Sequence, residues 1–193
     1  MSGDQDVATV FFDRDGTLNH DTSYIKSPEE LVLFPDTLAA IKQCNDSGIR
    51  VIVVSNQSGL ARGYFSSRDL EAIHQYLRDQ LCEGGAWIDD IFVCPHHPDD
   101  ACWCRKPNPG MIEQALARYP INLEKSYVVG DKYIDVELAV NAHIKGLLVT
   151  TGPSSKKSLQ MIHENHLPVA FVAECLQDAV RWIVDDVKNV VVA

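Results

Sequence analysis

Short apolar runs alternate along this chain with longer segments whose apolar positions recur at helical spacing. The apolar runs predict buried strands at residues 7–12, 50–54, 88–93, 127–129, 146–149 and 170–172. Helices are predicted after Pro35, from Ser66 to about Cys82, from Pro109, and over residues 134–141, 158–165 and 176–187. Strands that alternate with helices predict an α/β fold, with a mostly parallel sheet and right-handed crossovers. We expect residues 1–193 to form a single domain.

Two local signals mark the ends of predicted helices. Ser66 and Asp69 have the spacing of a capping box, in which each side chain satisfies a backbone N–H of the other residue. Gly48 follows the helix after Pro35 and predicts its end, because glycine readily adopts the left-handed conformation found there.

The first apolar run stops on two carboxylates one residue apart, Asp13 and Asp15. Ligands of open α/β sheets bind beyond the carboxyl ends of the strands, so both residues are predicted at the mouth of a site. Strand alternation places their side chains on one side and points Arg14 away. Neighbouring carboxylates repel unless a cation or a proton intervenes, and hard divalent cations take oxygen ligands. A solvated acidic turn is the alternative for an isolated pair.

Composition excludes some partners. The chain has 193 residues, 46 % of them apolar, which is enough to bury a sizeable core. A net charge of −10 argues against nucleic-acid binding, although local cations and a metal could still admit a phosphorylated substrate. No apolar run approaches the roughly 20 residues of a membrane span, and the polar N-terminus lacks the basic region of a signal peptide. We therefore expect a cytoplasmic protein with no membrane partner. We also expect it to be a monomer.

Three of the six cysteines crowd into eleven positions, in the pattern Cys94-x-His96-x₅-Cys102-x-Cys104. In a cytosolic chain this crowding beside histidine favours a metal site over disulfides. Three thiolates and one imidazole suit tetrahedral Zn²⁺ with no open position, which is typical of a structural site. His97 competes with His96 as the fourth ligand, and free thiols packed by chance are the alternative.

Three more polar segments accompany D-x-D-G-T. They are Ser55-Asn56-Gln57-Ser58, Arg105-Lys106-Pro107 and Gly130-Asp131-Lys132, with Asp135 one helical turn beyond the last. In this order the four segments resemble those of the haloacid dehalogenase-like (HAD) phosphohydrolases, over residues 7 to about 150. The resemblance implies a Rossmann-like HAD fold. Only 37 residues separate Thr17 from Ser55, so we expect no large cap domain.

The resemblance also implies roles for individual residues. Asp13 is expected to attack phosphorus and form an aspartyl-phosphate, while Asp15 protonates the leaving group and then activates water. Ser55 is expected to bind a phosphoryl oxygen, and Lys106 to neutralise charge on the nucleophile and the phosphoryl group. Mg²⁺ is expected on Asp13, the Asp15 backbone carbonyl and Asp131.

The Cys/His loop and C-R-K-P-x-P-G-M narrow the resemblance to the subgroup of heptose-bisphosphate and histidinol-phosphate phosphatases, and its Cys-x-His spacing implies His96 as the zinc ligand. Substrate contacts are expected from Asp21, Thr22, Ser23, Tyr24, Ser55, Asn56, Gln57, Ser58, Arg105, Lys106 and Lys132. The expected substrate is D-glycero-D-manno-heptose 1,7-bisphosphate, cleaved at the 7-phosphate, because no dehydratase domain for histidine synthesis is fused to this chain. A histidinol-phosphate phosphatase and a non-catalytic sugar-phosphate sensor are the alternatives.

Two charged positions keep open interpretations. Arg105 has the planar fork that grips phosphate, so with Lys132 and Arg62 it could meet a second phosphate; a solvated basic surface is the alternative. Asp135 could orient Asp131 or Lys132, or could be an ordinary helix acid.

Overall fold

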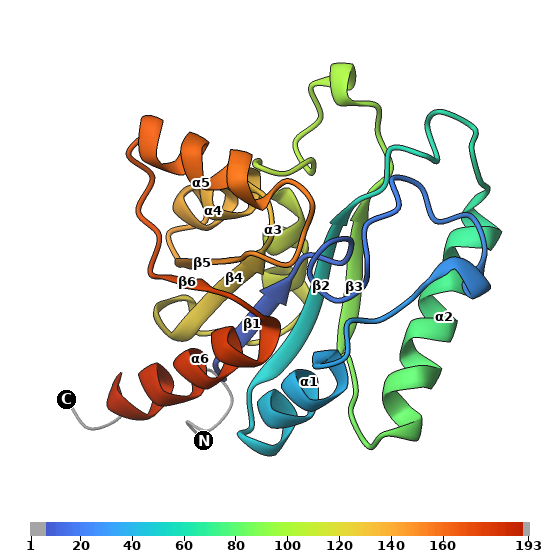
Figure 1. Cartoon of the computed structure of the whole chain (residues 1–193). Coiled ribbons are helices and arrows are strands. Elements are labelled where there is room, and N and C mark those ends of the chain that lie inside the picture. The colour runs from blue at the N-terminus through green and yellow to red at the C-terminus, as the bar shows by residue number, and fades with distance from the viewer. Residues whose placement is uncertain (1–6, 191–193) are drawn as a thin grey trace.

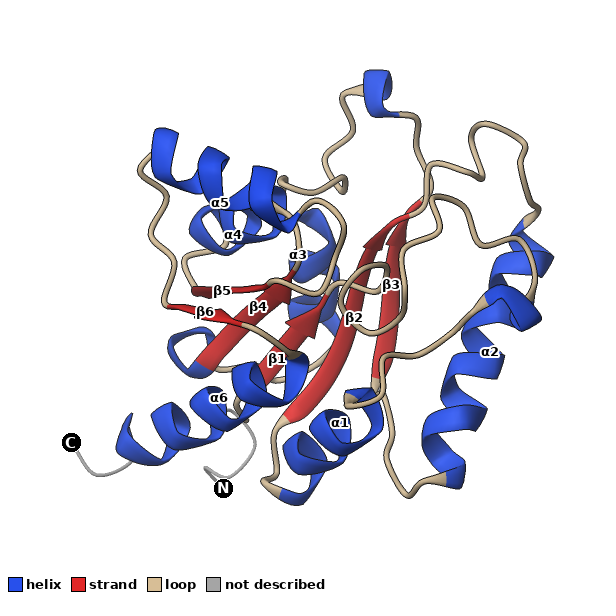
Figure 2. Cartoon of the chain, in the orientation of Figure 1, coloured by secondary structure: helices blue, strands red, loops and turns tan. Residues whose placement is uncertain are grey.

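The computed structural model describes residues 7–190. Six parallel strands form one sheet in the order β3-β2-β1-β4-β5-β6 (Figure 2). The strands are β1 (Thr9–Phe12), β2 (Arg50–Asn56), β3 (Asp90–Cys94), β4 (Ser126–Gly130), β5 (Lys145–Val149) and β6 (Phe171–Ala173). The helices are α1 (Thr37–Asp46), α2 (Ser67–Glu83), α3 (Gly110–Arg118), α4 (Tyr133–Asn141), α5 (Ser155–Glu164) and α6 (Leu176–Val190). Three short 3-10 helices add η1 (Pro28–Glu30), η2 (Pro98–Asp100) and η3 (Leu123–Lys125). The predicted α/β class and parallel sheet are confirmed.

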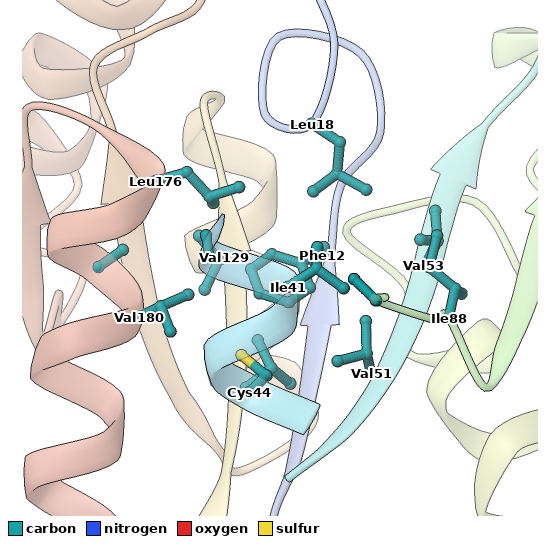
Figure 3. Close-up of a cluster of buried hydrophobic side chains, with 14 of the residues drawn as sticks. Phe12, Leu18, Ile41, Cys44, Val51, Val53, Ile88, Val129, Leu176 and Val180 are labelled. Carbon is teal, nitrogen blue, oxygen red and sulfur yellow. The ribbon is translucent and has the colours of Figure 1, made fainter. Parts of the chain in front are cut away.

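Alternating residues of each strand divide the core between the two faces of the sheet. Phe12 belongs to one cluster with buried residues of α1, α2 and α6, and Figure 3 shows it packed beside Ile41 of α1. Phe11 belongs to a second cluster with buried residues of α3 and α4. The helices therefore cover both faces of the sheet.

The strand order reverses at β1. The chain builds β2 and β3 on one side of β1 and then crosses to place β4, β5 and β6 on the other. Such a switch point leaves a crevice at the carboxyl ends of the two central strands, β1 and β4. Figure 1 shows the loops that follow β1, β2 and β3 at that same end of the sheet.

The predicted helix ends are confirmed. Ser66 and Asp69 form the capping box at the start of α2. Beyond α1, Gly48 has a φ of +69° and lets the Ile49 N–H reach the Cys44 carbonyl at 3.0 Å. The second strand is two residues longer than predicted, because Ser55 and Asn56 still pair with β3.

The described chain leaves little room for a cap domain. Within residues 7–190, η1 and α1 are the only helices between β1 and β2, and α2 is the only one between β2 and β3. The expectation of no large cap is confirmed. Among the same residues, none of the helices combines the length and the apolar content that crossing a bilayer would need.

Candidate active site

The site forms where β1, β2 and β4 end. Asp13 directly follows β1, and its backbone N–H donates to the Val129 carbonyl of β4 at 2.8 Å. Ser55 lies near the end of β2, and Asp131 directly follows β4. Lys106 reaches the same place from the loop between β3 and α3. Four residues far apart in the sequence thus meet as the motifs predicted.

Lys106 is surrounded by acceptors. Its Nζ lies 2.6 Å from Asp13 Oδ1 and 2.7 Å from Asp135 Oδ1, and it donates to the Val54 carbonyl at 3.0 Å. The residue is only 4 % exposed, and although burial opposes its charge, the two carboxylates raise the pKa of Lys106 above its ordinary value. Asp135 is therefore no ordinary helix acid. It also accepts from the Lys132 N–H at 3.1 Å, so it fixes the start of α4.

Asp131 is a buried carboxylate whose nearest cation, the Lys132 Nζ, lies 3.9 Å from its Oδ1, beyond hydrogen-bond distance. Both of its oxygens are buried without a hydrogen-bond partner among the described residues. Burial and the neighbouring charge of Asp13 raise the pKa of Asp131 to about 8. Two glycines enclose it: a Cβ on Gly16, whose φ is +93°, would lie 2.6 Å from the Asp131 carboxyl carbon, and one on Gly152 would come closer still.

A divalent cation fits this arrangement. Asp13, Asp131 and Asp135 each offer a buried oxygen within 4.8 Å of the others. Burial also raises the pKa of Asp13, so the metal-free site disfavours the charge that its carboxylates would carry. Mg²⁺ prefers oxygen ligands, and carboxylates whose negative charge is not balanced by nearby cations suit it well.

Asp15 is held by four donors rather than by the carboxylate cluster. Arg14 binds it with Nε at 3.1 Å and Nη2 at 2.9 Å, Asn19 donates at 3.0 Å, and Gln57 donates at 2.9 Å. Burial would raise the pKa of Asp15, but the Arg14 charge and these hydrogen bonds lower it overall. The prediction that Arg14 points away is wrong. The strand ends at Phe12, so strand alternation does not extend to residues 13–15.

The side chains of the last residue of β2, Asn56, and of the residue that follows it, Gln57, form hydrogen bonds within the protein. Gln57 Nε2 bridges Asp15 and the Ser55 hydroxyl, the latter at 2.8 Å. Asn56 donates to the Lys106 carbonyl at 3.2 Å and accepts from the Lys106 N–H at 3.1 Å. These two amides were expected to contact substrate, and here they order Asp15, Ser55 and Lys106.

A cavity of about 300 Å³ adjoins Asp15. Its lining comprises Arg14, Asp15, Asp21, Ser23, Tyr24, Ile25, Asn56, Gln57 and Ser58. The structure thus brings together most of the two segments expected to touch substrate. Of the expected contacts, Thr22, Ser55, Arg105, Lys106 and Lys132 fall outside this lining.

Two further contacts shape the cavity walls. Lys132 Nζ lies 3.0 Å from Asp21 Oδ2, and despite burial the nearby carboxylates raise the pKa of Lys132. The rings of Tyr24 and Tyr64 meet edge to face with centroids 4.7 Å apart, which joins the loop after β1 to the loop after β2. Arg105 keeps one buried nitrogen, Nη1, without a partner among the described residues.

The Cys/His cluster forms as predicted. Cys94, His96, Cys102 and Cys104 place their donor atoms within 4.8 Å of one another, and no sulfur pair is bonded. His97 lies outside the cluster and contacts Asp99 instead, at 3.3 Å. Burial and the neighbouring thiols raise the pKa of Cys104 to about 12. Four such donors fit Zn²⁺, which would stabilise the thiolates.

Sequence reasoning missed several residues of the site. It assigned no role to Asn19 or to His74, whose Nε2 lies 3.2 Å from Arg14 Nη1, and it left the Lys106–Asp135 pair undetected. His74 carried one usable signal: it lies on the buried face of α2, among Leu70, Ile73 and Leu77.

Comparisons with known proteins agree with this geometry. The sequence model of the HAD-hydrolase-like family matches residues 103–179. The D-glycero-α-D-manno-heptose-1,7-bisphosphate 7-phosphatase of Photorhabdus laumondii is 38 % identical over 170 residues, which are 83 % of this chain and 93 % of that protein. The D-glycero-β-D-manno-heptose-1,7-bisphosphate 7-phosphatase of Bordetella bronchiseptica is 41 % identical over 152 residues, which are 78 % of this chain and 85 % of that protein.

A solved structure extends the likeness to three dimensions. The crystal structure of the D,D-heptose 1,7-bisphosphate phosphatase from B. bronchiseptica, complexed with magnesium and phosphate, matches with a TM-score of 0.86. Its sequence is 37 % identical, and the match covers 93 % of this chain and 99 % of that one. Since identity above 30 % extends over more than two thirds of the chain, this protein belongs to the HAD-like hydrolases, the family of these heptose-bisphosphate phosphatases.

Proposed function

We propose that this protein is a Mg²⁺-dependent phosphatase that removes the 7-phosphate of D-glycero-D-manno-heptose 1,7-bisphosphate. The observation that carries the proposal is a buried Asp13 paired with Lys106 and lying beside Asp131, whose two oxygens lack hydrogen-bond partners among residues 7–190. This arrangement offers a nucleophile, a fixed positive charge and a cation site together. The names of the relatives at 38–41 % identity support the substrate.

The residues divide the work of phosphoryl transfer. An Asp13 oxygen forms a bond to phosphorus as the ester P–O bond breaks, giving an aspartyl-phosphate. Asp15 is ionised before substrate binds, because its four donors lower its pKa. It takes a proton from the bound phosphate monoester and gives it to the departing alkoxide. It later takes a proton from the water that hydrolyses the intermediate and passes it to the product phosphate. Lys106 stays charged and offsets negative charge on Asp13 and the phosphoryl group. Ser55 donates to a phosphoryl oxygen.

Asp13, Asp131 and the Asp15 backbone carbonyl would hold Mg²⁺. When bound, the ion supplies neutralisation of the phosphoryl and carboxylate charge. Asp135 forms an ion pair with Lys106, so we propose that it holds Lys106 in place and does not bind the Mg²⁺ ion itself.

The substrate would lie in the cavity beside Asp15. Hydroxyl groups of the sugar are met by side chains of two loops, and a second phosphate by cations at the rim. The proposed contacts are Asp21, Thr22, Ser23, Tyr24, Ser55, Asn56, Gln57, Ser58, Arg105, Lys106 and Lys132. Asn56 and Gln57 would act mainly by holding Lys106, Asp15 and Ser55 in place.

Zn²⁺ would occupy the Cys94, His96, Cys102 and Cys104 cluster as a structural ion. Its proposed role is to fix the loop that carries Arg105 and Lys106. We further propose a single-domain, cytoplasmic monomer. Every proposed catalytic group comes from one chain, and the unbonded cysteines suit a reducing compartment.

The test is phosphate release with Mg²⁺, measured side by side on heptose 1,7-bisphosphate and histidinol phosphate. We expect the heptose to be preferred by about a hundredfold, which is about 2.7 kcal/mol of transition-state binding. Asp13→Asn should abolish release, whereas Asp79→Asn, on the exposed face of α2, should leave it intact. Preference for histidinol phosphate would contradict the substrate, and binding without release would favour a sensor.

A further inference from the structure

A buried row of polar side chains leads from helix α2 to Asp15. His74 Nε2 lies 3.2 Å from Arg14 Nη1, and Arg14 uses its other two nitrogens, Nε and Nη2, to bind both oxygens of Asp15. Arg14 is 1 % exposed and His74 is 7 % exposed. A charged guanidinium buried this deeply needs partners on every side, and these two residues provide them.

The direction of the contact follows from the chemistry of the two groups. Arginine has donors and no acceptor, so His74 Nε2 must be the acceptor and the ring must be neutral. Burial and the charge of Arg14 lower the pKa of His74 to about 3, with Asp15 and Arg78 the other charged groups that face it. His74 thus accepts from Arg14 Nη1 and leaves the other two donor nitrogens of Arg14 to Asp15.

We propose that His74 and Arg14 are positioning residues, which fix the plane of the Asp15 carboxyl group at the cavity wall, where it passes a proton to the leaving group. The imidazole fixes the guanidinium, and the guanidinium fork fixes the plane of the carboxylate at the cavity wall. The inference rests on the proposed function, in which Asp15 is the acid. Asn19 donates to Oδ1 and Gln57 to Oδ2 from two separate side chains, so they lack the rigid fork with which Arg14 binds both oxygens.

The leaving group offers a specific readout. A sugar alkoxide is a poor leaving group and needs the proton from Asp15, whereas 4-nitrophenolate departs without one. Acid catalysis is typically worth 10²–10⁴-fold, so a misplaced acid should slow alkyl esters selectively. The ratio kcat/KM reports only the steps through departure of the leaving group, and so excludes the later attack of water.

The variants separate positioning from packing. His74→Ala removes the acceptor, and His74→Gln restores one through its amide oxygen. Arg14→Lys keeps the charge and loses the fork, which makes it a second probe should His74→Ala fold poorly. Leu77→Ala is the matched control, because Leu77 is a buried residue of the same helix whose side chain is purely apolar.

The experiment compares kcat/KM for 4-nitrophenyl phosphate with that for the alkyl phosphate the wild type prefers, heptose bisphosphate or histidinol phosphate. We expect His74→Ala and Arg14→Lys to lose about tenfold or more on the alkyl ester and less than about threefold on the aryl ester. His74→Gln should recover most of the loss, and Leu77→Ala should change both substrates equally.

Equal losses on both esters for His74→Ala and Arg14→Lys, or no loss on either, would overturn the inference while leaving the phosphatase intact. A wild type that releases phosphate from neither ester would instead overturn the proposed function, and this inference with it.

Discussion

Asp131 is a carboxylate kept ready for a cation. Its pKa near 8 means that the folded protein without metal holds a proton there, whereas the unfolded chain releases it near pH 4. Between these values the folded state binds more protons, so this group makes the metal-free protein less stable as pH rises. Mg²⁺ bound at the proposed site would displace this proton, so its stabilising effect should grow over the same range.

Calorimetry at pH 6, 7 and 8.5 tests this directly. The rise in Tm on adding Mg²⁺ should increase with pH, by up to about 1.4 kcal/mol of binding free energy per pH unit below pH 8. Asp131→Asn should remove both the metal-free pH dependence that it causes and the Mg²⁺ effect. A Mg²⁺ effect of the same size at all three values would contradict this role for Asp131.

At this scale the sequence predicted the residues that carry motifs and missed those that support them. Asp13 and Asp131 meet because they directly follow β1 and β4, whose carboxyl ends lie at the same edge of the sheet. Lys106 joins them from the loop between β3 and α3. The contact of His74 with Arg14 joins residues 60 positions apart, and no local pattern encodes it. Asp135 was found as a residue, but its partner depends on where the loop after β3 places Lys106.

At the scale of elements, the segment between β3 and α3 has little regular structure to hold it. Its only regular element is the 3-10 helix η2. The segment nevertheless places Lys106 Nζ 2.6 Å from Asp13 Oδ1. We expect Cys102→Ser to lose the zinc proposed for this cluster and to lower activity by about 10²-fold even in saturating Mg²⁺, since small displacements of a positioned group cost that much.

Zinc content and phosphate release measured on the same sample would check this. Cys82→Ser is the matched control, because Cys82 is an exposed free thiol outside the cluster. Full activity in zinc-free protein would show that the loop is held by Asn56 and packing alone.

Helix α6 is fixed at the opposite end of the strands. Asp186 accepts from Tyr127 at 2.6 Å and from Lys145, and these donors lower the pKa of Asp186 although burial opposes the shift. Stability from a depressed carboxyl pKa is present above the unfolded value and is lost as pH falls through the folded one. Asp186→Asn should therefore reduce the free energy of unfolding by about 1–3 kcal/mol at pH 7.

Urea unfolding at pH 7 and pH 3 would measure this. The difference from wild type should shrink at pH 3, and activity at pH 7 should be unchanged. Asp185→Asn alters the exposed neighbour on the same helix and should have little effect. A difference that persists undiminished at pH 3 would point to packing rather than charge.

Element boundaries followed from the sequence wherever a local signal set them. The capping box at Ser66 and the glycine after α1 are examples. The end of β2 was misplaced because pairing with β3, a non-local event, extends the strand through Asn56.

At the scale of the whole molecule, the proposed substrate would contact groups from several loops. Arg105 has a buried nitrogen with no partner among the described residues, which is what a second phosphate would satisfy. Arg105→Ala should lower kcat/KM about 10- to 100-fold for the bisphosphate, as expected for a hydrogen bond to a charged group. Heptose 7-phosphate, which lacks the second phosphate, should lose less than about threefold. Equal losses on both substrates would contradict this role.

The sequence predicted a parallel α/β sheet without a large cap, and the structure has both features. The order of the strands in the sheet was not predicted, because it depends on which strands pair across long separations in the sequence. Alternation of strands and helices is compatible with several orders, so the switch point at β1 was not predicted from residues alone.

The crowding of charge at the end of the sheet sets an order of events. The carboxylates of Asp13, Asp21, Asp131 and Asp135 face two ammonium groups, those of Lys106 and Lys132, which leaves a formal charge of −2 when all are ionised. A phosphate ester arriving first would meet net repulsion, whereas a divalent cation arriving first cancels it. We therefore expect ordered binding, in which the metal binds before the phosphate ester. Calorimetric titration with inorganic phosphate should show affinity only for the Mg²⁺-loaded protein. The concentration of free magnesium in the cell would then determine the fraction of the protein that can bind substrate.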